Sequence, residues 1–219
     1  MTALSLRDIS HSWPGGATLR LPALDVAEAE RVLLLGRSGS GKSTLLSLVC
    51  GTRAPDAGTV TVCRTELSSL RAAARDRLRA ERIGVIFQEF NLLPFGVVRD
   101  NIHLPLRFAP ERRARTAPGE AEDLCRALAL PDGVLEVKAH TLSVGQQQRV
   151  AVARALIGAP PLVVADEPTS ALDADAQAAF MDLMFGQLDR TGAALLMVSH
   201  DERLAPRFDR VLRIEEVLA

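Results

Sequence analysis

Residues 36–43 have the composition of a loop that binds phosphate groups. They match the pattern G-x-x-x-x-G-K-[ST] and follow the apolar run at 32–35. Between a strand and a helix, the glycines of such a loop let successive backbone N–H groups point toward one polyphosphate. Lys42 would reach the β- and γ-phosphates, and the hydroxyl of Ser43 would ligate Mg²⁺. The residues expected to contact the nucleotide are Gly36, Arg37, Ser38, Gly39, Ser40, Gly41, Lys42, Ser43 and Thr44.

An acidic pair, Asp166 and Glu167, ends the apolar run at 161–165. Such a run predicts a buried central strand, and open α/β sheets bind ligands at the carboxyl ends of their strands. We therefore expect Asp166 to hold Mg²⁺ through water, and Glu167 to polarise the water that attacks the γ-phosphate. An ordinary polar strand end is the alternative for the pair alone, but the phosphate loop upstream favours catalysis.

Residues 142–146, Leu-Ser-Val-Gly-Gln, form a second pattern that suits an anion. Ser143 is a good N-cap for a helix over 146–156, and the start of a helix attracts phosphate. One γ-phosphate does not need two loops from the same subunit, so we expect Ser143, Gly145 and Gln146 to serve the nucleotide of a second subunit. A plain helix start is the alternative.

Two further polar residues follow strand-like runs. Gln88 comes after Val-Ile-Phe at 85–87, and its amide can contact Mg²⁺ or the attacking water while the loop behind it moves with a partner. A surface glutamine at a strand end is the alternative. His200 follows the run at 195–199, and its imidazole can donate to phosphate and hold Glu167 and the water in register.

The other histidines show no comparable context, and no pair among them has the spacing of a zinc site. We expect surface or satisfied core positions for His11, His103 and His140.

Together these features resemble the ATP-binding cassette (ABC) ATPases in order and spacing across nearly the whole chain. The resemblance rests on the phosphate loop, Gln88, the segment at 142–146, the acidic pair, Ser-Ala-Leu-Asp at 170–173, and His200. Residues 87–94, Phe-Gln-Glu-Phe-Asn-Leu-Leu-Pro, are similar to the subgroup that energises lipoprotein release and macrolide export.

The resemblance implies binding and hydrolysis of ATP with Mg²⁺ by two cassettes, most simply identical, that close head to tail. It also implies a separate transmembrane permease as partner and a peripheral location on the cytoplasmic face of the inner membrane. Cargo contacts would then belong to the permease.

The resemblance implies roles for two further residues and shows one position where this sequence departs from the family. Trp13 stands where the family places an aromatic residue that stacks on adenine, although packing against Pro14 is an alternative. Asp173 would cross the dimer boundary, cap a helix from Ala174 onward, or do both. Val144 departs from the usual glycine, which permits close approach and positive φ, so we expect a weakened but working segment.

The elements needed to position these residues can be traced along the chain. Residues 4–24 alternate in polarity and predict an antiparallel hairpin. Strand-like runs at 31–35, 58–62, 83–87, 162–166, 193–198 and 210–214 predict a mainly parallel sheet wrapped by helices. Helical patterns near 97–106, 119–130 and 146–158 are joined through Pro110 and Pro118. The predicted fold is a single α/β P-loop NTPase domain over 1–219, with a small antiparallel β subdomain and an inserted α-helical subdomain at about 91–157.

The composition of the chain fits a single domain with an inserted subdomain. The chain has 219 residues, 47% of them hydrophobic, and a formal net charge of −1. That balance gives no electrostatic case for nucleic acid, and we interpret the arginine runs at 71–82 and 112–115 as solvated faces. Three widely spaced cysteines fit a reducing cytosol. No signal peptide or membrane-spanning run is present, so a membrane role would require a separate subunit.

Other functions fit the sequence less well than that of a transporter ATPase. Soluble ABC ATPases that act on DNA or ribosomes have tandem cassettes or coiled-coil insertions, which this sequence lacks. A membrane-tethered module whose ATP cycle signals without transport is the remaining alternative. A GTPase is disfavoured because the Asn-Lys-x-Asp motif is missing.

Overall fold

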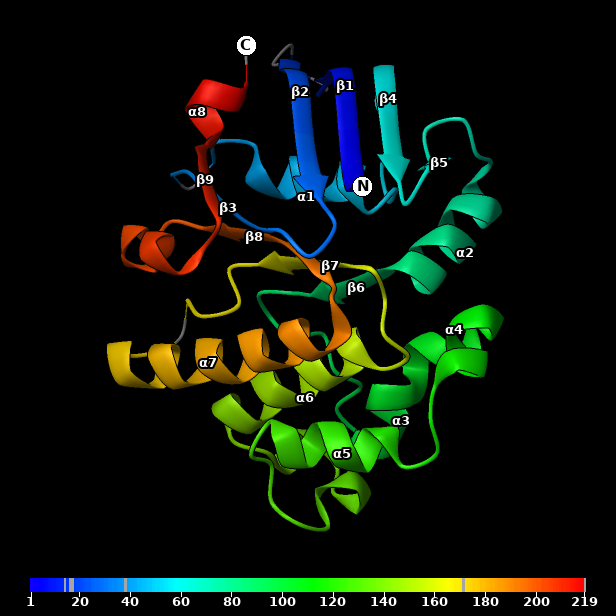
Figure 1. Ribbon diagram of the computed structural model, residues 1–219, viewed down its shortest axis with the longest axis vertical. Coiled ribbons are helices and arrows are strands. Elements are labelled where there is room, and N and C mark those ends of the chain that lie inside the picture. The colour runs from blue at the N-terminus through cyan, green and yellow to red at the C-terminus, as the bar shows by residue number, and fades with distance from the viewer. Residues whose placement is uncertain (14, 16–17, 38, 171, 219) are drawn as a thin grey trace.

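A five-stranded parallel sheet lies at the centre of the chain, with the strand order β6-β7-β8-β3-β9 (Figure 1). The computed structural model describes residues 1–13, 15, 18–37, 39–170 and 172–218. The strands of this sheet are β3 (Arg31–Leu35), β6 (Ile83–Ile86), β7 (Leu162–Asp166), β8 (Ala194–Ser199) and β9 (Arg210–Arg213).

The three inner strands of this sheet, β7, β8 and β3, are buried on both faces, which explains why they are continuous apolar runs. In β3, Leu33 and Leu35 pack with the helices on one face, whereas Val32 and Leu34 pack toward α1 and the second sheet. Burying each such side chain contributes about 1.5–3 kcal/mol. The same period-2 division repeats along β7 and β8, so one sheet separates two hydrophobic cores.

A smaller antiparallel sheet has the order β2-β1-β4-β5. It consists of β1 (Thr2–Ser12), β2 (Thr18–Ala27), β4 (Ala57–Val62) and β5 (Thr65–Glu66). The predicted hairpin is confirmed, because β1 pairs antiparallel with β2. Assigning 58–62 to the parallel sheet was wrong, since β4 pairs with β1. Only Val60 and Val62 of β4 are fully buried, and such alternation is typical of an antiparallel strand with one wet face.

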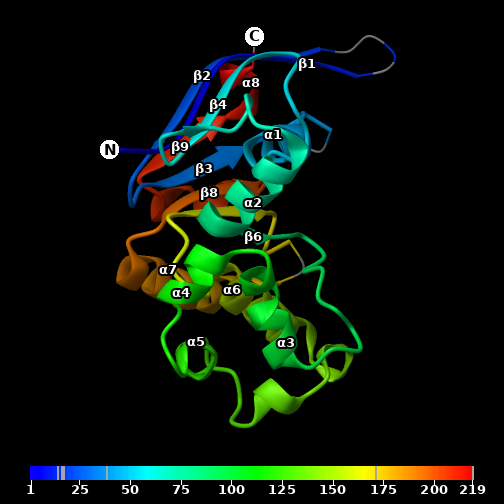
Figure 2. The same cartoon turned by 90° about the vertical axis from the view of Figure 1, so that its right-hand side faces the viewer.

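Helices pack against the sheets and fill the end of the molecule that lies opposite the antiparallel sheet (Figures 1 and 2). They are α1 (Lys42–Val49), α2 (Ala72–Arg82), α3 (Val98–His103), α4 (Pro110–Arg115), α5 (Glu120–Ala127), α6 (Val144–Leu156), α7 (Ala174–Thr191) and α8 (Ile214–Val217). The described residues also form four 3-10 helices: η1 (Leu104–Arg107), η2 (Val134–Glu136), η3 (Ala139–Thr141) and η4 (Glu202–Arg207). Across the described ranges, none of the helices has the length and apolarity needed to span a membrane.

Residues 91–157 contain α3 to α6 and no strand, and we retain these limits as the proposed extent of a helical lobe. One segment within it differs from expectation. Residues 110–115, predicted as a linker, form α4, because a proline is tolerated in the first turn of a helix.

The arginine run at 112–115 was predicted to be a solvated face. This prediction is wrong for Arg112, which is only 1% exposed. Its guanidinium donates to the carbonyls of Ile157 at 2.6 Å, Ala155 at 2.7 Å and Ala80 at 3.1 Å. These carbonyls lie at the ends of α6 and α2, where helices leave such groups without partners. Burial lowers the pKa of Arg112 to about 10, so the group stays charged at neutral pH.

Candidate nucleotide-binding site

The phosphate loop connects the end of β3 to the start of α1, as predicted from the sequence. Gly39 and Gly41 have φ of +79° and +96°, a region that favours glycine. A side chain at Gly36 would collide with Ile214 and come within 2.9 Å of the Ser40 hydroxyl. The backbone therefore curls in a way that only glycine permits. Ser38, a predicted phosphate contact, lies outside the described residues.

A cavity of about 790 Å³ brings most of the predicted residues together. Its described lining is Trp13, Arg37, Gly39, Gly41, Lys42, Ser43, Thr44, Gln88, Asp166, Glu167 and His200. These residues come from positions almost 190 apart in sequence, at the ends of β1, β6, β7 and β8 and around α1. Gly36 and Ser40 shape the same loop but are not part of this lining.

Lys42 and Glu167 face each other across this cavity. Lys42 is 6% exposed, and its Nζ donates to the carbonyls of Gly36 at 2.7 Å and Arg37 at 2.8 Å. The same Nζ lies 3.6 Å from Oε1 of Glu167. Glu167 itself has a φ of +43°, which L-residues rarely adopt, and its N–H donates to the carbonyl of Val198 at 3.0 Å.

Asp166 lies beside Glu167 at the carboxyl end of β7. Burial raises the pKa of Asp166, and the Glu167 carboxylate raises it further, while Lys42 and a hydrogen bond with Ser43 oppose the shift. Two adjacent carboxylates in a partly buried site favour a cation. Ser43 and Gln88 add oxygen atoms to the same cavity, and oxygen ligands are those that Mg²⁺ prefers. The residues present thus fit a magnesium ion.

Trp13 follows β1 directly and lines one side of the cavity, half-buried. Its ring packs edge-on against His11, with centroids 5.7 Å apart. Pro14, the alternative packing partner, lies outside the described residues. His11 matches the prediction only in part: its side chain is 11% exposed and neither ring nitrogen has a hydrogen-bond partner among the described residues, but Nδ1 lies 3.9 Å from Oδ1 of Asp56. His140 fits the prediction, because its Nδ1 lies 2.8 Å from the carbonyl of Pro94.

Ser143 caps α6 through a reciprocal pair of hydrogen bonds. The N–H of Gln146 donates to Ser143 Oγ at 3.3 Å, and the N–H of Ser143 donates to Gln146 Oε1 at 3.0 Å. This capping box starts α6 at Val144, two residues earlier than predicted. None of Ser143, Gly145 and Gln146 belongs to the described lining of the nucleotide cavity.

Val144 is the first residue of α6 and does not have a positive φ, so the conformational freedom of glycine is not needed at this position. Its side chain is 53% exposed. The valine methyl groups stand on the outer surface beside Ser143 and Gly145, where a glycine would permit closer approach to a ligand.

Asp173 is confirmed as an N-cap, since its Oδ1 accepts a hydrogen bond from the N–H of Ala176 at 2.8 Å. Sequence reasoning missed two buried polar residues of α6, Gln148 and Arg154, which are 1% and 6% exposed. Gln148 donates to the carbonyl of Pro168, next to Glu167. Alternating polar and apolar residues in this helix gave no signal that these two side chains turn inward.

Comparison with known proteins places this geometry in a family. The family model described as "ABC transporter" matches residues 19–170. The lipoprotein-releasing system ATP-binding protein LolD of Pseudomonas fluorescens is 40% identical over 97% of this chain and 95% of its own length. The macrolide export ATP-binding/permease protein MacB of Shigella flexneri is 37% identical over 97% of this chain, which spans 33% of that larger protein.

Solved structures agree with the sequence relatives. The dimeric, ADP- and phosphate-bound ATP-binding cassette MJ0796 superimposes with a TM-score of 0.81 at 32% identity, covering 96% of this chain and 93% of that one. The predicted α/β P-loop fold, with its parallel and antiparallel sheets and its helices, is thereby confirmed. The chain therefore belongs to the ABC transporter family and is an ATP-binding ATPase of that family.

Proposed function

We propose that two copies of this chain close head to tail around two ATP molecules and drive a separate transmembrane permease. One observation carries the proposal. The cavity gathers the phosphate loop, the acidic pair and His200, while Ser143, Gly145 and Gln146 lie at the start of α6, outside the described lining of that cavity. A second subunit that brings its own helix start to the γ-phosphate would complete the site. The MJ0796 cassette, whose structure is a dimer bound to ADP and phosphate, supports this arrangement.

Within one subunit, each residue would have a distinct task. Backbone N–H groups of 36–41 and the Lys42 ammonium bind the phosphates. Glu167 accepts a proton from the attacking water. His200 donates from Nδ1 to Glu167 and keeps that carboxylate oriented, and when its ring is protonated on Nε2 as well it donates toward the γ-phosphate. Trp13 offers an aromatic face for the adenine base.

Ser43, Gln88 and Asp166 are the residues that would hold Mg²⁺. The ion, when bound, would neutralise charge on the phosphate oxygens. Gln88 also begins the loop that leads away from the site. A partner that contacts this loop would therefore shift the Gln88 amide relative to the nucleotide.

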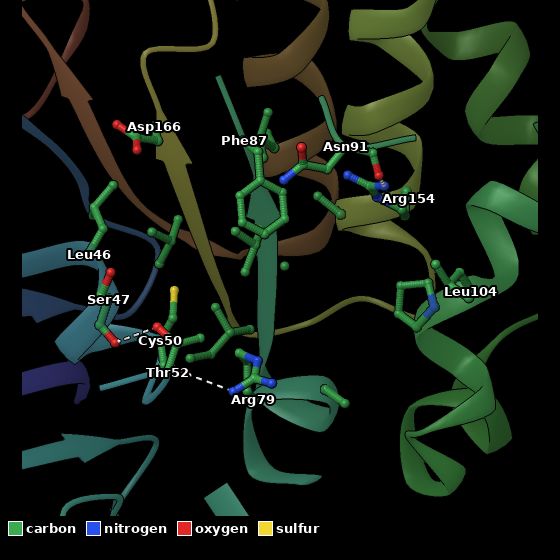
Figure 3. Close-up of a pocket in the computed structure, with 18 of the residues that line it drawn as sticks. Leu46, Ser47, Cys50, Thr52, Arg79, Phe87, Asn91, Leu104, Arg154 and Asp166 are labelled. Atoms are coloured by element: carbon green, nitrogen blue, oxygen red, sulfur yellow. Dashed lines mark hydrogen bonds between the residues drawn. The ribbon is translucent and has the colours of Figure 1, made fainter. Parts of the chain in front are cut away.

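We propose a docking groove for the permease beside the nucleotide site. This groove, of about 460 Å³, shares Ser43 and Asp166 with the nucleotide cavity (Figure 3). Its lining is largely apolar and includes Leu46, Ile83, Val85, Ile86, Phe87, Leu104, Pro105 and Phe108. Phe87 and Phe108 are 42% and 65% exposed. Exposed aromatic side chains around a groove suit an apolar segment of a partner.

The relatives suggest which system this would be. LolD and MacB are named for lipoprotein release and macrolide export. By that analogy, the chain would sit at the cytoplasmic face of the inner membrane, held there by its permease.

Affinity purification from detergent-solubilised membranes tests this function. We expect the tagged chain to retain an integral membrane protein, and we expect the complex in lipid vesicles to hydrolyse ATP faster than the chain alone. Replacing Phe87 with Asp should abolish both results without weakening nucleotide binding. Recovery of the chain without any membrane protein, at wild-type expression, would contradict the proposed partner. A complex that hydrolyses ATP but moves no substrate would instead favour the signalling module.

A further inference from the structure

Helix α6 connects the partner-facing segment to the loop behind Gln88. Its N-terminus carries Ser143, and its last turns carry Arg154. The Arg154 guanidinium donates to the carbonyl of Asn91 at 2.6 Å and to the carbonyl of Phe90. The side chain is 6% exposed, so these bonds are shielded from water.

The loop that Arg154 holds does not adopt its shape easily. Phe90 and Asn91 have φ of +59° and +47°, two consecutive non-glycine residues in the left-handed region. Such a conformation is unfavourable for a bulky residue such as phenylalanine. External contacts must therefore maintain it, and the two bonds from Arg154 are contacts of this kind.

The same side chains form part of the docking groove. Asn91 and Arg154 both line it, together with Phe87 and Asp166. Figure 3 shows Arg154 beside Asn91, on the far side of the groove from Asp166. A segment that entered the groove would touch the loop and its anchor on α6 together.

We propose that Arg154 is a positioning residue: it fixes the loop that follows Gln88 against α6, and so links the glutamine of one nucleotide site to the helix start that serves the other. This inference rests on the proposed function. The guanidinium group suits this role, because its planar set of N–H donors can bond two adjacent carbonyls at once, which an ammonium group does less well.

Arg112 provides a matched control on the same helix end. It also donates to carbonyls at the C-terminal end of α6, at Ala155, Ile157 and Arg154 itself, and it is buried as well, at 1% exposed against 6% for Arg154, but it does not bond the loop at 88–91. Its other acceptors lie on and after α2. Loss of either arginine should weaken the fold, whereas only loss of Arg154 should displace Gln88.

The test compares Arg154→Lys with Arg112→Lys in the purified chain. We expect both variants to melt at a lower temperature. Arg154→Lys should lower kcat for ATP by about ten-fold or more while its KM stays within about two-fold, because misplacing a positioning group costs turnover. Arg112→Lys should keep kcat close to that of the parent at a temperature where both variants are folded.

A double-mutant cycle separates positioning from stability. Phe90→Gly makes the left-handed conformation easy, so Arg154→Lys should cost clearly less turnover in that background than in the parent. Equal losses in both backgrounds, or equal losses of kcat in the two lysine variants, would overturn the proposal. If the parent chain hydrolysed no ATP, or if Glu167→Gln left hydrolysis intact, the proposed function would fail instead.

Discussion

His200 Nδ1 lies 2.7 Å from Oε2 of Glu167, although the two residues follow different strands and are 33 positions apart. A carboxylate only accepts, so the ring carries its proton on Nδ1 in this bond. The other oxygen, Oε1, lies 3.6 Å from Lys42 Nζ. Glu167 is thus held between a hydrogen-bond donor and a cation, with its backbone at positive φ. This preorganisation is what a general base needs to keep its orientation toward water.

Glu167→Gln should retain ATP binding, because the amide keeps the size of the side chain and the loop contacts are unchanged. Hydrolysis should fall by orders of magnitude, since an amide cannot accept the proton of the attacking water. Single-turnover hydrolysis and equilibrium nucleotide binding, measured on the same protein, check both parts. Unchanged turnover would show that another group acts as the base.

Asp166→Asn should stabilise the protein in the presence of a chelator at neutral pH. The folded-state pKa of Asp166 is raised above its ordinary value of 3.8, so the folded protein binds this proton more tightly than the unfolded chain. Stability from this group is complete below pH 3.8 and is lost as the pH rises through the folded-state pKa. Asparagine cannot ionise, so the advantage of the variant in thermal unfolding should grow with pH.

Mg²⁺ provides the control for that experiment. With nucleotide present, the ion should raise the melting temperature of the parent and have little effect on Asp166→Asn, which should also lose hydrolysis. A variant that is less stable than the parent at pH 7 without metal would contradict the electrostatic account of this site.

Val144→Gly should increase ATP hydrolysis by the chain assembled with its membrane partner. The valine methyl groups stand exposed beside Ser143 and Gly145, where a glycine would allow closer approach to phosphate. Glycine inside a helix lowers stability by about 0.5–1 kcal/mol. Steady-state hydrolysis measures the gain in activity, and thermal unfolding measures this loss of stability separately. Hydrolysis no faster than in the parent would mean that valine does not limit the closed dimer.

Arg112→Ala should lower the free energy of unfolding by about 3 kcal/mol or more. It leaves the buried carbonyls of Ala155 and Ile157 without donors and opens a cavity between helices. The exposed neighbour is a matched control: Arg113→Ala should change stability by no more than about 0.5 kcal/mol. Urea unfolding compares the two, and similar losses would refute the assigned role of Arg112.

Parts of the fold could be predicted from the sequence where the spacing of apolar residues and the turn-forming residues indicated the same element. Strands at 31–35 and 162–166 were correct in type and extent, because a run buried on both faces leaves an unbroken apolar signal. The pairing of 57–62 with β1 could not be read from its sequence. Partner choice depends on packing between segments far apart in the chain, and a strand's own residues do not encode which edge it joins.

Local chemistry predicted many of the residues that line this cavity, since the phosphate loop and the acidic pair each follow a strand of the same parallel sheet. Buried polar residues were harder to predict. Arg112, Gln148 and Arg154 satisfy backbone carbonyls at helix ends and in loops, and which carbonyls come near them is decided only when the helices pack.

The central claim is that each ATP contacts the phosphate loop of one protomer and Ser143 of the other. Mixing two inactive variants, Lys42→Ala and Ser143→Arg, tests it directly by steady-state ATP hydrolysis. In a mixed head-to-tail dimer one site carries both defects and the other carries neither, so we expect the mixture to regain substantial activity although each variant alone has almost none. Activity in the mixture no higher than the average of the two separate variants, with mixed dimers demonstrated by tags, would contradict the account.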